Sequence, residues 1–433
     1  MKPSEIVAVT AMQTSTDVRN PAVKVTVTTA DGKQGSSSSF EGYSASDYRP
    51  SYLYDYGKKY LGNGVTTAVS IIENIIAPAI IGMDAAKQGE VDCAIKGALD
   101  AAGVAHCVNI TNPVSLAVLK AAAQSLQIPL YRHIGGCSAF TLPYGGYRVA
   151  SGSKRYWPDN KSQSGPVYNL VSYGFDSFAD AHYALWEAAN AYEALLAKRL
   201  GILVHRGFSL DIPAGRISSD RELLDMMVEG IEKAGHTGKI GIHIDVGAGM
   251  YYDPDPGVYR GLFDAADKTP DELFAYYEAL IADYPVVILQ DPFDQHDMER
   301  HSALLERTGI EIAGQELCGS DPERIKECID AGCVNAVVLS VCSFETFSDV
   351  VGVVRYAKNR AVDIIPQNRC GEGLDVAHFA VGFRTGAIYQ GGIDTVSNQL
   401  LAMEQEIGPR ARFYGENGLK GGRFGLRKRM IGE

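Results

Sequence analysis

A repeated pattern in the second half of the chain restricts the fold more than any other sequence feature. Short apolar runs, each followed by an amphipathic helical segment, end at Asp245, Gln290, Gln315, Ser340, Gln367 and Tyr389. Successive end points are 45, 25, 25, 27 and 22 residues apart. A strand, a loop and a helix at this period are typical of parallel βα units. Six such units favour a closed barrel over an open doubly wound sheet, and no glycine-rich phosphate loop supports the open sheet.

The N-terminal part of the chain has a different rhythm. Residues 20–30 alternate apolar and polar side chains before Asp31-Gly32, which predicts a half-buried strand and a hairpin turn. The Ser- and Tyr-rich residues 35–60 lack periodicity and predict a long mobile loop. We expect helices at 65–76, 90–101, 113–126 and 178–200. The sequence therefore predicts an α/β protein with an α+β domain over residues 1–137 and a barrel over residues 138–433.

Composition excludes several classes of protein. The 433 residues are 46% hydrophobic and 21% charged, which provides a sizeable core and argues against intrinsic disorder. The 40 Lys and Arg residues against 52 Asp and Glu give a net charge of −12. That balance argues against binding to nucleic acid or to an anionic membrane.

Two further features indicate a cytoplasmic protein. The longest apolar stretch, Ile75–Gly82, is far too short to span a bilayer, and the first residues lack the pattern of a secretory signal. The eight cysteines are scattered without a CxxC spacing, as expected of reduced thiols in a core.

Polar residues at the carboxyl ends of barrel strands are where such folds carry their chemistry. This rule selects Asp245, Gln290, Asp291, Gln315, Glu316, Ser340, Gln367, Asn368, Arg369 and Tyr389.

Several stretches resemble the enolase (phosphopyruvate hydratase) family over nearly the whole chain. The most specific is DYPVVILQDPFDQHD from residue 283, with RNPAVKV from 19, KKYLGNGVTTAV from 58, IPLYRHIGG from 128, KIGIHIDVGAGMYYD from 239, VGFRTGAIYQGG from 381 and NQLLAMEQEIG from 398. The resemblance implies an N-terminal capping domain on a modified eight-stranded TIM barrel, a homodimer or higher oligomer, and a carbon–oxygen lyase that dehydrates 2-phosphoglycerate with Mg²⁺.

The metal site that the resemblance implies is changed. The three acidic metal ligands of the family correspond to Asp245, Gln290 and Gln315, so one carboxylate is left. A hard divalent cation prefers anionic oxygens, and we therefore expect weak or absent Mg²⁺ binding. Asp291 and Glu316 follow the changed positions and are alternative ligands, although neighbours on a strand point to opposite faces. Asp291 could instead hold the loop geometry.

The catalytic residues that the resemblance implies are changed as well. The family's lysine base corresponds to Ser340, and its partner lysine to Tyr389. The family's loop histidine corresponds to Lys154, and two acidic residues on the opposite wall correspond to Asn169 and Ile212. Serine cannot act as a base at neutral pH unless a neighbour activates it. We therefore expect altered or absent 2-phosphoglycerate chemistry.

Some strand-end residues allow two interpretations. His243 shares a strand face with Asp245 and is either a replacement base or ligand, or a core histidine with its hydrogen bonds satisfied. Gln290 and Gln315 could be structural hydrogen-bonding residues, and Asp245 could cap a helix or pair with a lysine.

A phosphate-binding element is retained in the resemblance, at residues 367–372 (QNRCGE). Its arginine can contact phosphate or carboxylate oxygens in a bidentate manner. Next to it, Cys370 is either a nucleophile or a neutral replacement of serine. The candidate substrate-binding residues are Gln367, Asn368, Arg369 and Cys370, with Tyr43 or Ser44 near the serine of the family's mobile loop.

Two functions of different classes are compatible with these residues. One is a lyase that takes a different small phosphorylated or carboxylic acid. The other is a non-catalytic homologue that keeps the fold, the dimer surface and an anion pocket.

Overall fold

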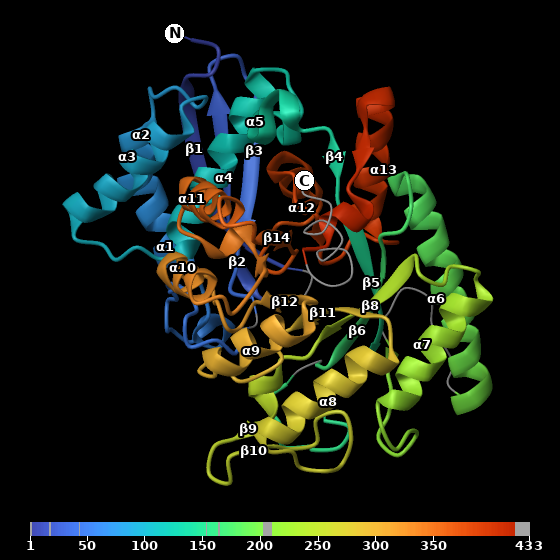
Figure 1. Ribbon diagram of the computed structural model, residues 1–433. Helices are drawn as coiled ribbons and strands as arrows, with labels where there is room; N and C mark the ends of the chain where they lie inside the picture. Colours follow the sequence, from blue (N-terminus) through green and yellow to red (C-terminus); the bar gives the residue numbers. More distant parts are fainter. Residues whose placement is uncertain are drawn as a thin grey trace.

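The structure, a computed structural model, describes residues 2–16, 19–42, 44–152, 154–162, 165–201 and 210–420. Figure 1 shows the N-terminal strands and helices packed beside the later βα units of a barrel. The N-terminal part of the chain and the barrel are therefore in contact. The division of the chain at residue 137 stays a prediction.

The N-terminal sheet confirms the predicted strand and hairpin. It consists of three antiparallel strands in the order β1 (Ile6–Ser15), β2 (Pro21–Thr29) and β3 (Gln34–Ser39). The side chains of Val23, Val25 and Val27 are fully buried on one face of β2, as period-two alternation requires. The turn before β3 contains Gly32 with a φ of 78°, a conformation that glycine adopts without steric cost.

The loop predicted over residues 35–60 starts later than expected, because residues 34–39 form β3. That part of the prediction is wrong. A Cβ atom on Gly35 would lie 2.2 Å from the carbonyl oxygen of Ala117 in helix α4 (Val108–Ser125). Only small side chains permit this close approach of the helix. The strand is therefore built from glycine and serine, and it lacks the large apolar residues by which a strand is recognised in a sequence.

Helices follow the sheet in the predicted places. Their bounds are α1 (Thr66–Ile71), α2 (Ala77–Ile80), α3 (Gln88–Ala102), α4 (Val108–Ser125) and α5 (Leu130–Gly135). A π-helical turn at Ile72–Ile76 joins α1 to α2. The fourth helix starts five residues before the predicted Pro113, which lies inside it.

In the described part of the chain the barrel sheet has nine strands, and eight of them follow one another around the barrel. Seven of these eight run parallel to one another. The ninth, β7 (Leu210–Asp211), pairs only with β5 (Tyr144–Ser151). In sheet order the eight are β14 (Asp363–Pro366), β13 (Ala336–Leu339), β12 (Glu311–Gly314), β11 (Val286–Gln290), β8 (Ile240–Asp245), β6 (Val167–Ser172), β5 (Tyr144–Ser151) and β15 (Ala387–Ile388). Only β6 is antiparallel to its neighbours. The backbone N–H of Tyr389 donates to the carbonyl of Pro366 at 3.0 Å, which joins the first and last strands. The predicted strand ends are confirmed to within one residue.

Helices cover the outside of the barrel. They are α6 (Phe178–Leu200), α7 (Arg221–Lys233), α8 (Pro270–Asp283), α9 (Met298–Thr308), α10 (Pro322–Asp330), α11 (Phe347–Lys358), α12 (Asp375–Phe383) and α13 (Thr395–Ile407). The shorter strands are β4 (Thr141–Leu142), β7 (Leu210–Asp211), β9 (Tyr252–Asp253), β10 (Val258–Tyr259) and β16 (Arg412–Phe413). The bounds predicted for the long helix at 178–200 are confirmed.

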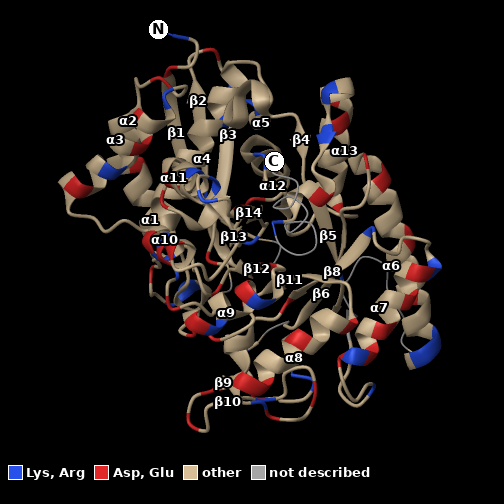
Figure 2. Cartoon of the chain, in the orientation of Figure 1, with Lys and Arg blue, Asp and Glu red and all other residues tan. Residues whose placement is uncertain are grey.

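Charged side chains lie mostly on these outer helices. Figure 2 shows Lys, Arg, Asp and Glu along α6, α7, α8 and α13, whereas the barrel strands carry few. Among the described residues, no helix is both long and apolar enough to cross a bilayer.

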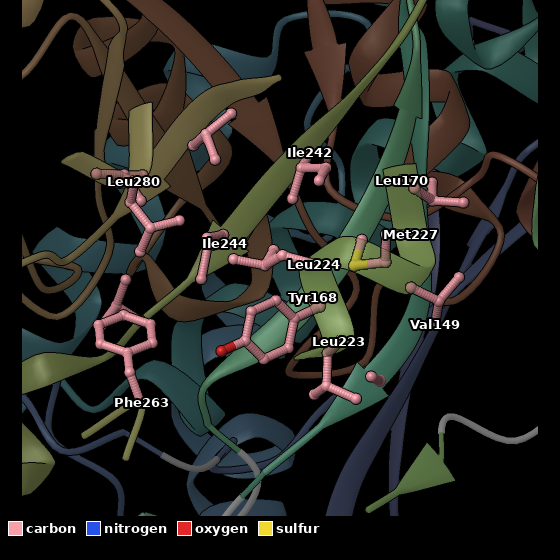
Figure 3. Close-up of a cluster of buried hydrophobic side chains, with 14 of the residues drawn as sticks. Val149, Tyr168, Leu170, Leu223, Leu224, Met227, Ile242, Ile244, Phe263 and Leu280 are labelled. Carbon is pink, nitrogen blue, oxygen red and sulfur yellow. The ribbon is translucent and has the colours of Figure 1, made fainter. Parts of the chain in front are cut away.

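Side chains along β6 and β8 alternate between the hydrophobic core outside the barrel and the candidate site inside it. Figure 3 shows residues of these strands packed with side chains of α7 in the cluster Tyr168, Leu170, Ile242, Ile244, Leu223, Leu224 and Met227. Successive strand residues point to opposite faces. The residues between them, Asn169, His243 and Asp245, therefore face the barrel interior.

Candidate active site

A cavity of about 870 Å³ opens at the carboxyl ends of the barrel strands. Strand-end residues form its floor, and residues of the segment after β3 form its other wall. The residues that line the cavity include Glu41, Ser44, Arg49, Tyr54, Arg148, Asp245, Gln315, Glu316, Gln367, Asn368, Arg369 and Tyr389. The site thus needs both the N-terminal part and the barrel.

A chain of hydrogen bonds crosses the barrel mouth in a single direction. The Nε2 atom of His243 lies 3.2 Å from Oε1 of Gln290, whose Nε2 donates to Oε1 of Gln315 at 3.2 Å. The amide of Gln315 then donates to Oε1 of Glu316 at 2.9 Å. Arg369 donates from Nη2 to the same oxygen at 2.8 Å. Each amide accepts from one neighbour and donates to the next, and the chain ends on a carboxylate.

The histidine at the start of this chain is neutral. His243 is 2% exposed, and burial lowers its pKa to about 4 against the opposing effect of its hydrogen bond to Gln290. The acceptor Oε1 of Gln290 places the imidazole proton on Nε2. The sequence left His243 open as a base or a core residue, and its Nε2 is here committed to the chain.

Asp245 and Tyr389 form a separate pair in the cavity. The hydroxyl of Tyr389 donates to Oδ2 of Asp245 at 2.7 Å. Burial raises the pKa of Asp245 to about 6, the hydrogen bond from Tyr389 opposes this rise, and the charge of Glu316 adds to it. Burial also raises the pKa of Tyr389. The pair therefore offers one carboxyl group that titrates near neutral pH.

The turn after β14 is held by Glu372. Its Oε1 accepts from the hydroxyl of Ser340 and, at 2.9 Å, from the backbone N–H of Cys342. Its Oε2 accepts from the backbone N–H groups of Arg369 and Cys370, each at 2.9 Å. This carboxylate fixes the backbone that carries the arginine, and it makes no recorded hydrogen bond to the guanidinium.

Neither Ser340, at the position of the family's base, nor Cys370, the candidate nucleophile, is well placed to react. Ser340 is 3% exposed and lines a small neighbouring cavity of about 30 Å³. Cys370 is 2% exposed, and burial raises the pKa of its thiol in spite of the nearby Arg369. Its sulfur lies 3.1 Å from the hydroxyl of Ser343. A buried protonated thiol is a poor nucleophile.

The structure places Asp291 outside the cavity. Its two carboxylate oxygens accept from the backbone N–H groups of Gln315, Glu316 and Leu317 at 3.0 to 3.2 Å. The residue is 2% exposed and has a φ of 46°. Of the two interpretations of Asp291, the hydrogen bonds favour control of loop geometry over metal binding.

The two positions that the resemblance assigns to catalytic loops, Ser44 and Lys154, lie in different surroundings. The hydroxyl of Ser44 donates to Oε2 of Glu316 at 2.8 Å, and the backbone N–H of Ala45 donates to the same oxygen at 2.9 Å. Lys154 is exposed and is not among the residues that line the cavity. Tyr43 lies outside the described residues. The segment after β3 is thus tied to the barrel through Glu316.

On the opposite wall, Asn169 and Ile212 have different surroundings. Asn169 is fully buried, and its Oδ1 has no hydrogen-bond partner among the described residues. Ile212 is 3% exposed and belongs to the main hydrophobic cluster. Only Asn169 has the polar atoms that a site requires.

Several residues of the cavity were not predicted from the sequence, among them Glu41, Tyr54 and two arginines. Arg148 lies on β5, directly opposite Asn169 of β6, and Arg49 lies in the segment after β3. Arg148 lies two residues after Gly146 on a strand, so the two share a face. The sequence did not show which face of β5 points into the barrel. Arg49 lies in a segment without periodicity, and the sequence offered no signal for it.

The residues of the mouth do not suit a magnesium ion. Gln290 is fully buried within the hydrogen-bonded chain, the oxygens of Glu316 serve Arg369 and Ser44, and Asp245 accepts from Tyr389. Across the described part of the chain, no three His, Cys, Asp or Glu residues gather as a metal site. Magnesium requires near-octahedral oxygen ligands and gives up its waters reluctantly. These donors therefore do not fit it.

Comparison with known proteins gives consistent results over most of the chain. Residues 6–134 match the family described as enolase, N-terminal domain, and residues 210–421 match enolase, C-terminal TIM barrel domain. An enolase of Methanopyrus kandleri is 32% identical over 424 residues, which cover 95% of this chain and 98% of that protein. An enolase of Methanococcus aeolicus is 30% identical over 414 residues, which cover 92% and 94%.

Proposed function

Because the chain belongs to the enolase family, whose members are carbon–oxygen lyases, we propose that it binds a small carboxylic or phosphorylated acid directly through its side chains. In this proposal no magnesium ion bridges the protein and the acid. The substrate accordingly differs from 2-phosphoglycerate.

The observation that carries the proposal is the single direction of the hydrogen-bonded chain. Gln290 and Gln315 must each accept one hydrogen bond and donate another. An ionised carboxylate can only accept, so glutamate or aspartate at these positions would break the chain. The two amides therefore belong to one arrangement, and they support a site organised around hydrogen bonds instead of a cation.

The cavity also retains groups for proton transfer. A carbon–oxygen lyase takes a proton from carbon and returns one to the departing oxygen. Asp245 lines the cavity with a pKa near 6, which suits a base at neutral pH, and Tyr389 donates to it. We assign the acid–base role to this pair and leave Ser340, whose hydroxyl is bonded to Glu372, out of it.

A specific contact favours the alternative, a non-catalytic homologue. Arg369, the retained anion anchor of the family, is bonded to Glu316, and the side chains of the two are only 18% and 13% exposed. If this ion pair stays closed, the anchor is not available to a ligand. The alternative keeps the fold and an anion pocket without turnover.

The test compares turnover and magnesium binding in the same preparation. We expect no conversion of 2-phosphoglycerate in a coupled assay with Mg²⁺, and calorimetry should find no Mg²⁺ binding tighter than about millimolar. A turnover of ~1–10³ s⁻¹, the range of ordinary enzymes, would contradict the proposal. So would micromolar Mg²⁺ affinity that disappears in Asp245→Ala but persists in the matched surface variant Asp255→Ala.

A second arm separates the lyase from the non-catalytic homologue. A panel of 2- and 3-hydroxy acids and their phosphate esters is incubated with EDTA-treated protein, and elimination is followed by NMR. Turnover that is lost in Asp245→Asn supports the lyase. Binding of acids without any turnover supports the non-catalytic homologue.

A further inference from the structure

The inward side of β5 places a guanidinium in the cavity. A Cβ atom on Gly146 would lie 2.8 Å from the carbonyl oxygen of Tyr389 and 3.8 Å from Cβ of Asn169, so position 146 faces the barrel interior. Arg148 follows two residues later on the same face and lines the cavity. Its charge acts on both Asp245 and Tyr389.

Two polar atoms at this wall have no hydrogen-bond partner in the described part of the chain. The Nε of Arg148 and the Oδ1 of Asn169 are both shielded from solvent without a hydrogen bond among the described residues. Asn169 is fully buried, and the two residues are register partners in the sheet. Buried polar groups are nearly always paired in folded proteins. The Nε–H of Arg148 requires an acceptor and the Oδ1 of Asn169 requires a donor, so a ligand that completes this wall presents both to it.

The charged side chains that line the cavity indicate the charge of a ligand that would bind there. Each of the three carboxylates already accepts a hydrogen bond: Glu41 from Tyr54 at 2.6 Å, Asp245 from Tyr389 at 2.7 Å, and Glu316 from Arg369 at 2.8 Å. Among the described residues, the guanidinium groups of Arg49 and Arg148 make no hydrogen bond or ion pair. The cavity therefore offers two guanidinium groups to anionic oxygens. Arg49 is exposed, and Arg148 carries the buried Nε–H that has no partner among the described residues.

We propose that Arg148 binds one anionic group of the substrate and that Arg49, across the cavity, binds a second. This rests on the proposed function, and it makes the substrate an acid with two separate anionic groups, carboxylate or phosphate. A guanidinium can hold such a group through two parallel hydrogen bonds. Arg148 thereby supplies positive charge at a mouth whose residues do not suit a metal ion. The open Oδ1 of Asn169 is an acceptor, so it can bond to a hydroxyl of the same ligand but not to its anionic oxygens.

The experiment measures binding of malonate and inorganic phosphate to EDTA-treated protein by calorimetry, with chloride matched for ionic strength. We expect both anions to bind the unmodified protein and to bind Arg148→Gln at least about tenfold more weakly, the change for one lost charge-assisted contact. Arg148→Lys keeps the positive charge but loses the two parallel N–H donors of the guanidinium. It should bind both anions more weakly than the unmodified protein and more tightly than Arg148→Gln. The surface variant Arg412→Gln is the matched control and should bind unchanged.

A second arginine variant separates the two anionic groups. Arg49→Gln should weaken malonate, which has two carboxylates, more than it weakens phosphate. Equal binding by the unmodified protein, Arg148→Gln and Arg148→Lys would overturn the inference and leave the proposed anion-binding function standing. If the unmodified protein binds neither anion, or binds them only with added Mg²⁺, the proposed function itself is wrong. Should Arg148→Gln not fold, the Arg148→Lys and Arg49→Gln series decides the question.

Discussion

At the scale of single residues, the site differs from a metal centre in what each side chain can donate. An amide has both a donor and an acceptor, whereas an ionised carboxylate has acceptors only. Gln290 and Gln315 use both functions in the chain between His243 and Glu316. Two changes that look like independent losses in the sequence are therefore parts of one hydrogen-bond network.

The first prediction concerns the middle of this chain. Gln290→Glu places a charge at a fully buried position and removes the donor that Gln315 requires. We expect the free energy of unfolding to fall by at least about 2 kcal/mol, as for a buried group left without its partner. Urea denaturation measures this change. Gln124→Glu, on an exposed position, is the control, and an equal effect of both substitutions would refute the role of the chain.

The second prediction concerns pH and a carboxyl group at the other end of the barrel. Glu311 begins β12 and accepts from the backbone N–H of Lys420 at 2.9 Å, and its Oε1 has no partner among the described residues. Burial, with the nearby charge of Asp363, raises the pKa of Glu311 from 4.5 to about 8. The folded protein therefore holds a proton that the unfolded chain has lost.

The sign of the effect follows from proton linkage. Because the folded state binds more protons than the unfolded state between pH 4.5 and about 8, the free energy of unfolding falls as the pH rises through this window. One pKa unit corresponds to about 1.4 kcal/mol. We expect Glu311→Gln to be at least about 2 kcal/mol more stable than the unmodified protein at pH 8, with little difference at pH 5. Parallel denaturation curves for the two proteins across this range would show that Glu311 does not titrate there.

At the scale of elements, the barrel strands were the most predictable part of the fold. Their apolar runs end in polar residues, and the strand ends of β8 and β11 fall at Asp245 and Gln290 as predicted. The third N-terminal strand was missed, since its serines and glycine are selected by the closeness of α4 and not by strand propensity. Propensity is a weak guide where a neighbouring element decides which side chains fit.

The third prediction tests the contact between β3 and α4. Gly35→Ala would put a methyl group 2.2 Å from backbone atoms of Ala117 and Ala121. Backbone cannot move aside as a flexible side chain does, so we expect a loss of about 2–3 kcal/mol, typical of overpacking. Gly89→Ala is the matched control, because nothing lies within 4 Å of its added Cβ and alanine favours a helix. Thermal unfolding of the two variants distinguishes them.

At the scale of the whole molecule, the cavity exists only because two parts of the chain meet. Glu316 of the barrel accepts from Ser44 and Ala45 of the segment after β3, and Arg49 of that segment lines the cavity. A barrel alone would lack this wall. The assignment of the substrate therefore depends on both parts.

The fourth prediction is that the protein is a homodimer, which the family resemblance implies. The segment near residue 60 exposes apolar side chains, with Tyr56 at 78% and Leu61 at 96% exposure, and such groups are commonly covered in interfaces. Sedimentation equilibrium should give twice the mass of the chain. A single species of monomer mass over the whole concentration range would contradict the prediction.

The sequence by itself determined the family, the barrel and the positions of its strand ends, because periodicity and turn residues act over short stretches of chain. Only the tertiary structure decided how the polar groups at those ends are used. The partners in the hydrogen-bonded chain are 47, 25 and 53 residues apart for His243–Gln290, Gln290–Gln315 and Glu316–Arg369. Which atom donates to which depends on strand register and barrel closure, and the direction of Arg148 into the cavity depends on the same register. Such long-range geometry has no local pattern from which it could be read.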